Sequence, residues 1–443
     1  MKNFEQFGMG IPEILLPENK NLMKWSVVAC DQYTQDEEYW KKASEIAGSS
    51  PSTLNLILPE VYLGRDDTED RIKKIQKTMK SYLEEGIFDS PQKEFIYLER
   101  KTAYGRTRKG LIAAIDLDSY EWKPFSKAKI RATEATIVAR IPPRKAIRKN
   151  APLELPHIML LVNDPEKKLV EGTGALVKNQ KPLYDGDLME NSGHISGWAV
   201  KDDEAVNQVY ESLLKIKEKN TDSEGNAFMF AVGDGNHSLA TAKAVWEEYR
   251  EEQKKAGVPE EKIALSAVRY ALVEIVNIYD SGLTFEPIHR VIFGADSEKL
   301  ICAMAEKLCG KIVDFTSEEE LENEVKNSKS DFGFVYTKDG KTIFKGIKTE
   351  IQELAVSRLQ PELDSFIADE NKNGAKIEID YIHGSEEVFR LGKKDGALSI
   401  MLPPVAKDSF FDTISKSGPL PRKSFSMGEA SEKRFYLECR KLF

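Results

Sequence analysis

The stretch FMFAVGDGNHSLATAKAVWEEYR, residues 228–250, holds the clearest structural signal in the sequence. Ala227–Val232 is an apolar run of strand length, and Ser238–Lys255 has helical periodicity with a charged outer face. The glycines and Asp between them mark a tight turn. The stretch therefore predicts a strand, a glycine turn and a long helix.

Apolar runs and helical patterns alternate on both sides of this stretch. This alternation favours a mixed α/β (α+β) fold over an all-α or all-β fold. A length of 443 residues suggests two or three domains, and we expect three α/β regions, 1–125, 126–290 and 291–443, with the turn in the second. The expected strands include Trp25–Cys30, Glu94–Glu99, Lys109–Asp116, Ile158–Val162 and Tyr270–Ile278, and the expected helices include Gln35–Ala47, Thr68–Glu85 and Val200–Lys219.

Composition narrows the class of protein. A net charge of -9 disfavours binding to nucleic acid or to an anionic membrane surface, so the expected partner is a small molecule. The four cysteines lack a C-x-x-C spacing, which argues against a disulfide framework or a structural zinc site. The first residues lack a secretion signal and the apolar runs are too short to span a bilayer. We expect a cytoplasmic protein and leave a homo-oligomer open.

The turn has the features of an anion site. Gly233 and Gly235 let the backbone approach a ligand, and the helix that follows presents unpaired N–H groups to a phosphate. Asp234 can hold Mg²⁺ or accept a proton, and His237 can donate to phosphate oxygens or move protons. The alternative is an ordinary Asp-Gly turn in which Asn236 and Ser238 only cap a helix.

A basic segment precedes this turn in the sequence. Arg140–Lys149 contains five basic residues and no acidic one, in a chain that is otherwise acidic. Arginine grips phosphate with two hydrogen bonds, so Arg140 and Arg144 are candidate phosphate ligands. A solvated helix face is the alternative.

The sequence VGDGNHSLATA resembles the D-G-H-H-R-x-x-T-A segment of domain-of-unknown-function family 1015, which has been linked to the ParB/sulfiredoxin-like group. Further stretches similar to that family are TEATIVARIPPRKAIR, EPIHRVI, DYIHG and PLPRKSFSMGEASEKRF. The resemblance implies a ParB/sulfiredoxin-like core, elaborated by additional α/β regions, that holds nucleotide phosphates at the glycine turn.

Two residues of the turn depart from the family pattern, and Thr133 stands where the family has a histidine before Glu134. Asn236 replaces the first histidine, and Ser238 replaces the arginine, for which Lys243 is the nearest substitute cation. Sulfiredoxin chemistry needs a cysteine where this chain has Asn236, so the resemblance excludes that activity. The resemblance to the group's serine kinase favours Glu134 as a general base, and ligation of Mg²⁺ is the alternative. The phosphate contacts would come from Gly233, Gly235, Asn236, Ser238, Arg131, Arg140 and Arg144, and candidate substrate contacts are Thr136, Thr241, His289 and Arg290.

Two other segments receive weaker expectations. The ending around Lys423 is a solvated tail segment by default, and the alternative is that it folds back toward the turn. Asp31-Gln32-Tyr33 would form a ligand loop. His157 and His194 lack the spacing of metal ligands.

The sequence as a whole predicts a nucleotide-dependent phosphotransferase or phosphohydrolase that acts on a small metabolite. Its catalytic residues would be Glu134, Asp234 and His237, with ATP or ADP and Mg²⁺ as cofactors, the Mg²⁺ on Asp234. The alternatives are a nucleotide-responsive binding protein without turnover, and a structural protein with a degenerate site.

Overall fold

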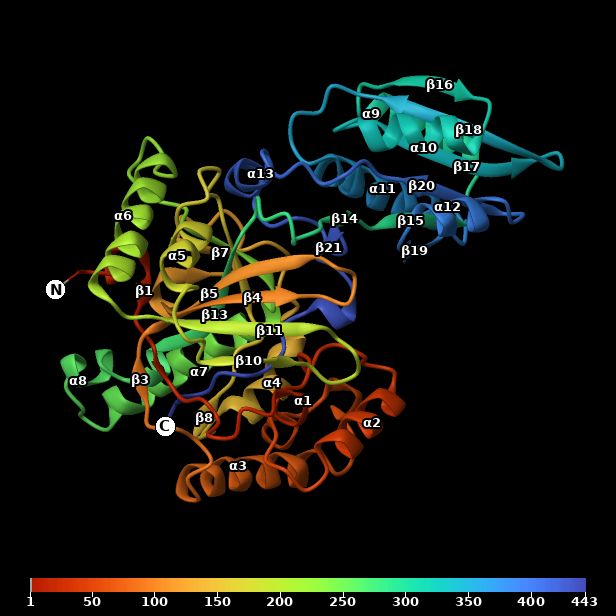
Figure 1. Ribbon diagram of the computed structural model, residues 1–443. Helices are drawn as coiled ribbons and strands as arrows, with labels where there is room; N and C mark the ends of the chain where they lie inside the picture. The colour runs from red at the N-terminus through yellow and green to blue at the C-terminus, as the bar shows by residue number, and fades with distance from the viewer. Residues whose placement is uncertain (1) are drawn as a thin grey trace. The chain divides into compact units, whose positions relative to one another are not determined.

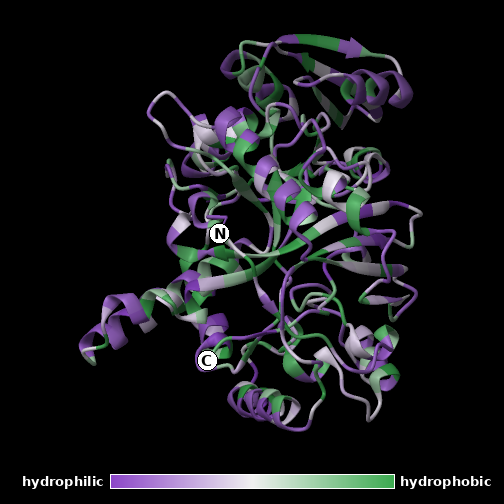
Figure 2. Cartoon of the chain, turned by 60° about the vertical axis from the view of Figure 1, so that its left-hand side comes forward, coloured by the Kyte–Doolittle hydropathy of each residue, from purple (hydrophilic) through white to green (hydrophobic). Residues whose placement is uncertain are grey.

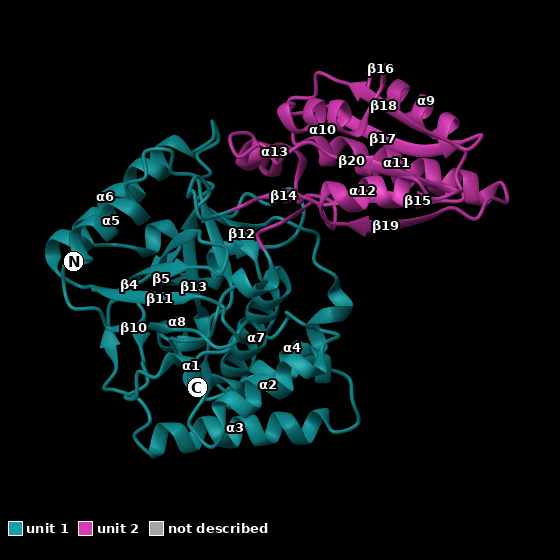
Figure 3. Cartoon of the chain, turned by 45° about the vertical axis from the view of Figure 1, so that its right-hand side comes forward, with its two compact units in different colours: residues 1–283, 429–443 teal, residues 284–428 magenta. Residues whose placement is uncertain are grey.

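The computed structural model describes residues 2–443. These residues form two compact units, unit 1 (residues 1–283 and 429–443, of which residue 1 is not described) and unit 2 (residues 284–428) (Figure 3). The units do not follow the three predicted regions, because strands from 1–125 and from 126–290 share one sheet. Residues 429–443, here called the C-terminal segment, return to unit 1 after unit 2 is complete.

A ten-stranded mixed sheet forms the centre of unit 1 (Figure 1). Its strand order is β10 (Tyr184–Asp187), β11 (His194–Val200), β4 (Phe95–Lys101), β5 (Thr107–Asp116), β13 (Tyr270–Asn277), β9 (Met159–Val162), β12 (Phe230–Asp234), β7 (Ile130–Ala132) and β6 (Tyr120–Glu121), with β1 (Met9–Gly10) added to β5. Two short pairs lie outside this sheet, β2 (Glu13–Ile14) with β3 (Gln92–Lys93) and β8 (Leu153–Glu154) with β22 (Arg440–Lys441).

Both faces of this sheet are buried. Neighbouring residues of a strand point to opposite faces, so Phe95 and Tyr97 enter one core while Ile96 and Leu98 enter the other. The first core includes side chains of α5 (Val170–Val177), α6 (Asp203–Lys219) and α7 (Asn236–Lys255). The second includes α1 (Leu22–Trp25), α2 (Glu37–Ala47) and α3 (Thr68–Glu84). Figure 2 shows the corresponding hydrophobic residues on the central strands and hydrophilic residues along the outer helices.

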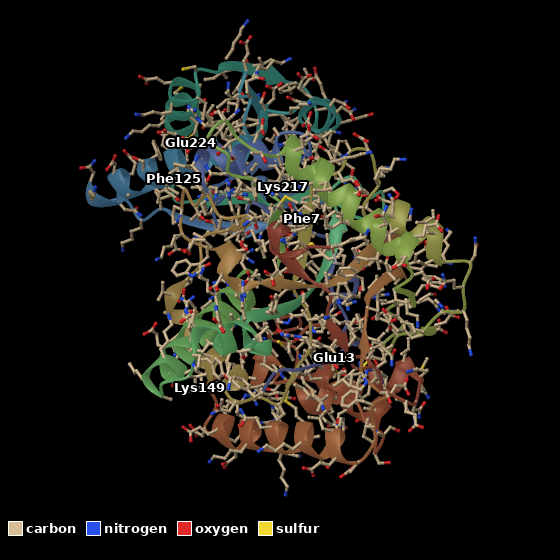
Figure 4. All side chains as sticks on the ribbon, turned by 90° about the vertical axis from the view of Figure 1, so that its left-hand side faces the viewer. Phe7, Glu13, Phe125, Lys149, Lys217 and Glu224 are labelled. Atoms are coloured by element: carbon tan, nitrogen blue, oxygen red, sulfur yellow. The ribbon has the colours of Figure 1, made fainter. Side chains whose placement is uncertain are left out.

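The remaining α-helices of unit 1 within the described residues are α4 (Ile141–Arg148) and α8 (Glu260–Ala264). The N-terminal residues pack on α6, where Lys217 lies over the ring of Phe7 at 6.0 Å from its centroid (Figure 4). Among residues 2–443, no helix has the length and apolar character needed to cross a membrane.

Unit 2 has its own antiparallel six-stranded sheet. Its order is β16 (Lys311–Phe315), β18 (Lys341–Lys348), β17 (Phe332–Lys338), β20 (Ala397–Met401), β15 (His289–Phe293) and β19 (Glu378–Ile382). The helices of this unit are α9 (Ser297–Lys307), α10 (Glu318–Asn327), α11 (Ala355–Lys372), α12 (Ser385–Gly392) and α13 (Phe410–Ser417), and β14 (Glu286–Pro287) pairs with β21 (Phe425–Ser426).

The mixed α+β class is confirmed, and most predicted elements occur within a few residues of their expected bounds. The strand predicted at Trp25–Cys30 is wrong, because α1 ends at Trp25 and the following residues belong to no sheet. They lie instead along the C-terminal segment, where Ala29 N–H donates to the Arg434 carbonyl and Tyr436 N–H donates to the Val27 carbonyl. The apolar run is buried, as its composition required, but by a distant part of the chain.

Candidate functional site

Three segments of unit 1 meet at one edge of the large sheet. Strands β7 and β12 are parallel, so Thr133 after β7 and the turn after β12 emerge at the same edge. Strand β9 is antiparallel to β12, with Asp234 opposite Met159, and therefore begins where β12 ends. This register brings His157, which precedes β9, to the predicted turn. The topology thus assembles a site that the sequence shows only as separate pieces.

Gly235 is the only residue between β12 and α7. Its φ of +80° lies in the left-handed region that favours glycine. A Cβ at this position would lie 3.0 Å from Ile158 Cγ1 and 3.2 Å from Ile158 Cα. The turn therefore needs glycine for its backbone conformation and for the close approach of β9.

The first turn of α7 presents open hydrogen-bond donors. Within residues 2–443, the backbone N–H groups of Asn236, His237 and Ser238 have no hydrogen-bond partner, and no side chain caps the helix. The Asn236 side chain instead accepts a bond from Thr133 N–H (3.2 Å) and donates one to Thr133 Oγ1 (3.3 Å). The glycine turn predicted as an anion site thus opens a helix whose donors are available to a ligand.

Two carboxylates and one cation lie at this helix start. Lys433 Nζ, from the C-terminal segment, is 3.6 Å from Asp234 Oδ2. Burial raises the pKa of Asp234, Lys433 opposes that shift, and the nearby charge of Asp31 adds to it. Asp31 belongs to the loop that the sequence marked as a ligand loop. The sequence did not identify Lys433.

His237 holds a loop in place. Its Nε2 accepts a hydrogen bond from Ile137 N–H at 3.2 Å, so the neutral ring carries its proton on Nδ1. Burial and the positive charges of Arg140 and Arg144 lower its pKa to about 4. His237 is therefore uncharged near neutral pH, and it fastens the segment after β7 to the start of α7.

Ser238 heads a chain of hydrogen-bonded side chains. Its Oγ lies 2.6 Å from His157 Nε2, and His157 Nδ1 lies 3.0 Å from the Tyr436 hydroxyl, which accepts a bond from Cys30 N–H at 3.2 Å. A cavity of about 130 Å³ opens beside this chain, and Ser238, His157 and Tyr436 all line it. No role was predicted for His157 from the sequence, although it directly precedes a predicted strand.

Most of the basic segment is paired with carboxylates. Arg144 pairs with Glu60, Lys145 with Glu248, Arg148 with Glu154, and Lys149 with both Glu248 and Glu252. Figure 4 marks Lys149 next to α7, which supplies Glu248 and Glu252. Arg140 is exposed and has no ion-pair partner within the described residues, so it is the member of this segment whose charge remains available.

The other predicted residues of unit 1 have diverse surroundings. Arg131 is buried, with its guanidinium 4.3 Å from the Phe228 ring centroid and its Nε donating to the Ala128 carbonyl. Lys243 is the cation proposed to replace the family's arginine. Its ammonium group donates a hydrogen bond to the Tyr120 carbonyl. Thr241 donates to the His237 carbonyl at 2.7 Å. Glu134 and Thr136 are half-buried, and the Thr136 hydroxyl has no hydrogen-bond partner among residues 2–443.

The remaining predicted residues belong to unit 2. His289 Nδ1 accepts a bond from Leu402 N–H at 3.1 Å, and its pKa is lowered to about 4 by burial and by Arg290. Arg290 is buried and donates to Gln360 Oε1 at 2.9 Å. Lys423 is also part of unit 2, whereas Lys433 and Tyr436 of the C-terminal segment reach the turn.

A family model described as "Protein of unknown function (DUF1015)" matches residues 13–366 of the chain. The chain belongs to this family. Among curated proteins, none matches its sequence.

Three solved structures are similar to this DUF1015 protein, each with a low TM-score. A free serine kinase in complex with AMP is 11% identical with a TM-score of 0.36, over 75% of this chain and 92% of that one. A conserved hypothetical protein from Pyrococcus furiosus is 11% identical with a TM-score of 0.33, over 72% and 90%. SbnI from Staphylococcus aureus, truncated at its C-terminus, is 8% identical with a TM-score of 0.35, over 72% and 83%. TM-scores this low do not establish a shared function.

Proposed function

We propose that the start of α7 binds the phosphates of a nucleotide and that the protein is a nucleotide-dependent phosphotransferase or phosphohydrolase acting on a small metabolite. The observation that carries the proposal is the set of unpaired N–H groups in the first turn of α7 beside Asp234 and Lys433. The helix dipole and these donors favour a phosphate, and Lys433 adds a full positive charge.

Each charged group has a separate task in this proposal. Lys433 and the exposed Arg140 neutralise charge on the phosphates. Asp234 either accepts the proton of the acceptor hydroxyl, a task suited to a carboxylate whose pKa is raised by burial, or holds Mg²⁺. His237 and Asn236 position the segment that carries Glu134 and Thr136, through Ile137 and Thr133. Glu134 remains a candidate base on the resemblance alone.

Mg²⁺ fits the residues at this site. Residues 2–443 contain no group of three or more His, Cys, Asp or Glu side chains that could hold a metal ion by themselves. Mg²⁺ commonly binds through one or two carboxylates together with substrate phosphates, and Asp234 and Asp31 supply two carboxylates. When bound with a nucleotide, the ion would neutralise phosphate charge.

The test is turnover of nucleotides in the presence of Mg²⁺. We would incubate the protein with ATP, ADP, CTP and GTP, with and without a pool of amino acids, and follow phosphorus species by NMR. The proposal expects turnover that Asp234→Asn abolishes and that Asp203→Asn, at an exposed position of α6, preserves. Saturable binding without turnover would support a nucleotide switch, and absence of both would contradict nucleotide binding altogether.

A further inference from the structure

The hydroxyl of Ser238 is oriented differently from an ordinary helix cap. Ser238 is the third residue of α7, and its Oγ contacts His157 Nε2 at 2.6 Å instead of capping the helix N–H groups. Ser238 is half-buried and lines the cavity of about 130 Å³. A serine hydroxyl in this position is accessible to a ligand and is paired with a base.

His157 is itself oriented by a third group. Its Nδ1 lies 3.0 Å from the hydroxyl of the buried Tyr436. That hydroxyl accepts the Cys30 N–H, and the Cys30 thiol is also within its hydrogen-bonding reach. When Tyr436 donates to the thiol and accepts from His157 Nδ1–H, Nε2 is left to accept the Ser238 proton. Nucleophile, base and orienting group then have the arrangement of activated serines.

The electrophile would lie next to this serine. The unpaired N–H groups of Asn236, His237 and Ser238 belong to the same helical turn, and Lys433 adds positive charge at Asp234. Apolar side chains, including Leu58, Ile147 and Leu155, form much of the cavity wall and restrict water. A phosphoryl group at the start of α7 is therefore bound within the same turn that carries the activated hydroxyl.

We infer that Ser238 is a nucleophile that takes the phosphoryl group from the nucleotide and forms a phosphoserine intermediate. This inference rests on the proposed function. In the first step, Ser238 Oγ forms a bond to phosphorus, the bond to the leaving nucleotide oxygen breaks, and the serine proton moves to His157 Nε2. In the second step, the acceptor hydroxyl or water attacks phosphorus and releases its proton to solvent, and His157 returns the proton it took to Ser238 Oγ as that oxygen leaves.

The first experiment measures covalent modification of the full chain. The wild-type protein is incubated with ATP and Mg²⁺, quenched in acid and mapped by peptide mass spectrometry, and a parallel sample is treated with a fluorophosphonate. We expect a phosphoryl group and the fluorophosphonate adduct on Ser238. Modification of another residue, or of none, overturns the inference without any variant being needed.

Variants then separate the nucleophile from its base. Ser238→Ala abolishes both modifications, and His157→Gln slows them by about 10²–10⁴-fold, the contribution typical of a general base. Tyr436→Phe gives a smaller loss, while Ser223→Ala, at an exposed position of unit 1, changes nothing. Nucleotide turnover that survives in Ser238→Ala would overturn the covalent step and leave the proposed function intact. Absence of wild-type turnover would instead contradict the proposed function.

Discussion

Lys433 and Arg434 are adjacent in the C-terminal segment, yet they belong to two different charged clusters. Arg434 is buried, 3.3 Å from Glu274 and paired with Glu438, while Arg108 holds the other Glu274 oxygen at 3.1 Å. Burial alone would raise the pKa of Glu274, but Arg108 and Arg434 outweigh it and keep that pKa below its ordinary value. Lys433 contacts Asp234 at 3.6 Å beside unpaired helix donors.

The difference between the two clusters separates stability from binding. The side chains of Arg434, Glu274 and Glu438 have 0% exposure, so every charge there must find its counter-charge within the protein. The cluster at Asp234 has two carboxylates, one lysine and open N–H groups, and its side chains are partly accessible. The buried cluster fixes the fold, and the open cluster keeps interactions available for a ligand.

The largest effect is expected in the buried cluster. Glu274→Ala leaves Arg108 and Arg434 without their shared counter-charge, so the free energy of unfolding of unit 1 should fall by about 3–5 kcal/mol. Urea denaturation followed by tryptophan fluorescence measures this unit, because all five tryptophans lie in it. The control is Glu38→Ala, which removes an exposed ion pair with Lys42 and should cost less than about 1 kcal/mol. Equal losses in both variants would remove the distinction between buried and exposed pairs.

Gly235→Ala tests the turn between β12 and α7. We expect a loss of about 2–3 kcal/mol in the free energy of unfolding, because a left-handed backbone and a close contact with Ile158 both oppose a Cβ. Gly225 has a φ of +86° and no atom within 4 Å of the position that a Cβ would take, so Gly225→Ala reports the backbone cost alone. A loss at Gly235 no greater than at Gly225 would mean that the approach of β9 is not constraining.

Lys433→Met should alter ligand binding more than stability. Removing a charge-assisted contact to phosphate should weaken ADP binding about tenfold, roughly 1.5 kcal/mol, as measured by calorimetry. Lys181→Met, at an exposed position, serves as the control and should leave the affinity unchanged. Unchanged affinity in Lys433→Met would mean that Lys433 pairs with Asp234 and does not contact the phosphate.

The smallest effect at neutral pH is expected for His237→Gln, where a single hydrogen bond to Ile137 is at stake, about 1 kcal/mol. The effect depends on pH because the pKa of His237 is lowered from 6.5 to about 4 in the folded protein. A lowered pKa contributes stability above pH 6.5 that is lost as the pH falls toward 4. Between pH 6.5 and 4, the urea denaturation midpoint should therefore fall less in His237→Gln than in the wild-type protein. A parallel decline in both proteins would contradict the neutral, buried state of this ring.

Local patterns predicted much of the fold. The periodicities of α2, α3 and α7 and the strands β4 and β5 could be predicted from neighbouring residues, as could the turn at Gly235. The strand predicted at Trp25–Cys30 was wrong because an apolar run indicates that residues are buried but does not indicate which part of the chain packs on them. Lys433 and Tyr436 were missed for the same reason, since the contacts that bring the C-terminal segment to β12 join distant parts of the sequence. His157 required the antiparallel register of β9 and β12, which no single-strand pattern contains.

The division of unit 1 by unit 2 has a consequence for the order of synthesis. A ribosome completes β12, α7 and the whole of unit 2 before it adds Lys433 and Tyr436. Until then, Asp234 lacks its cation, His157 lacks its hydroxyl partner, and Glu274 lacks Arg434. The last part of the larger unit to be made thus supplies both a stabilising charge and the final residues of the candidate site, so a nascent chain acquires them together.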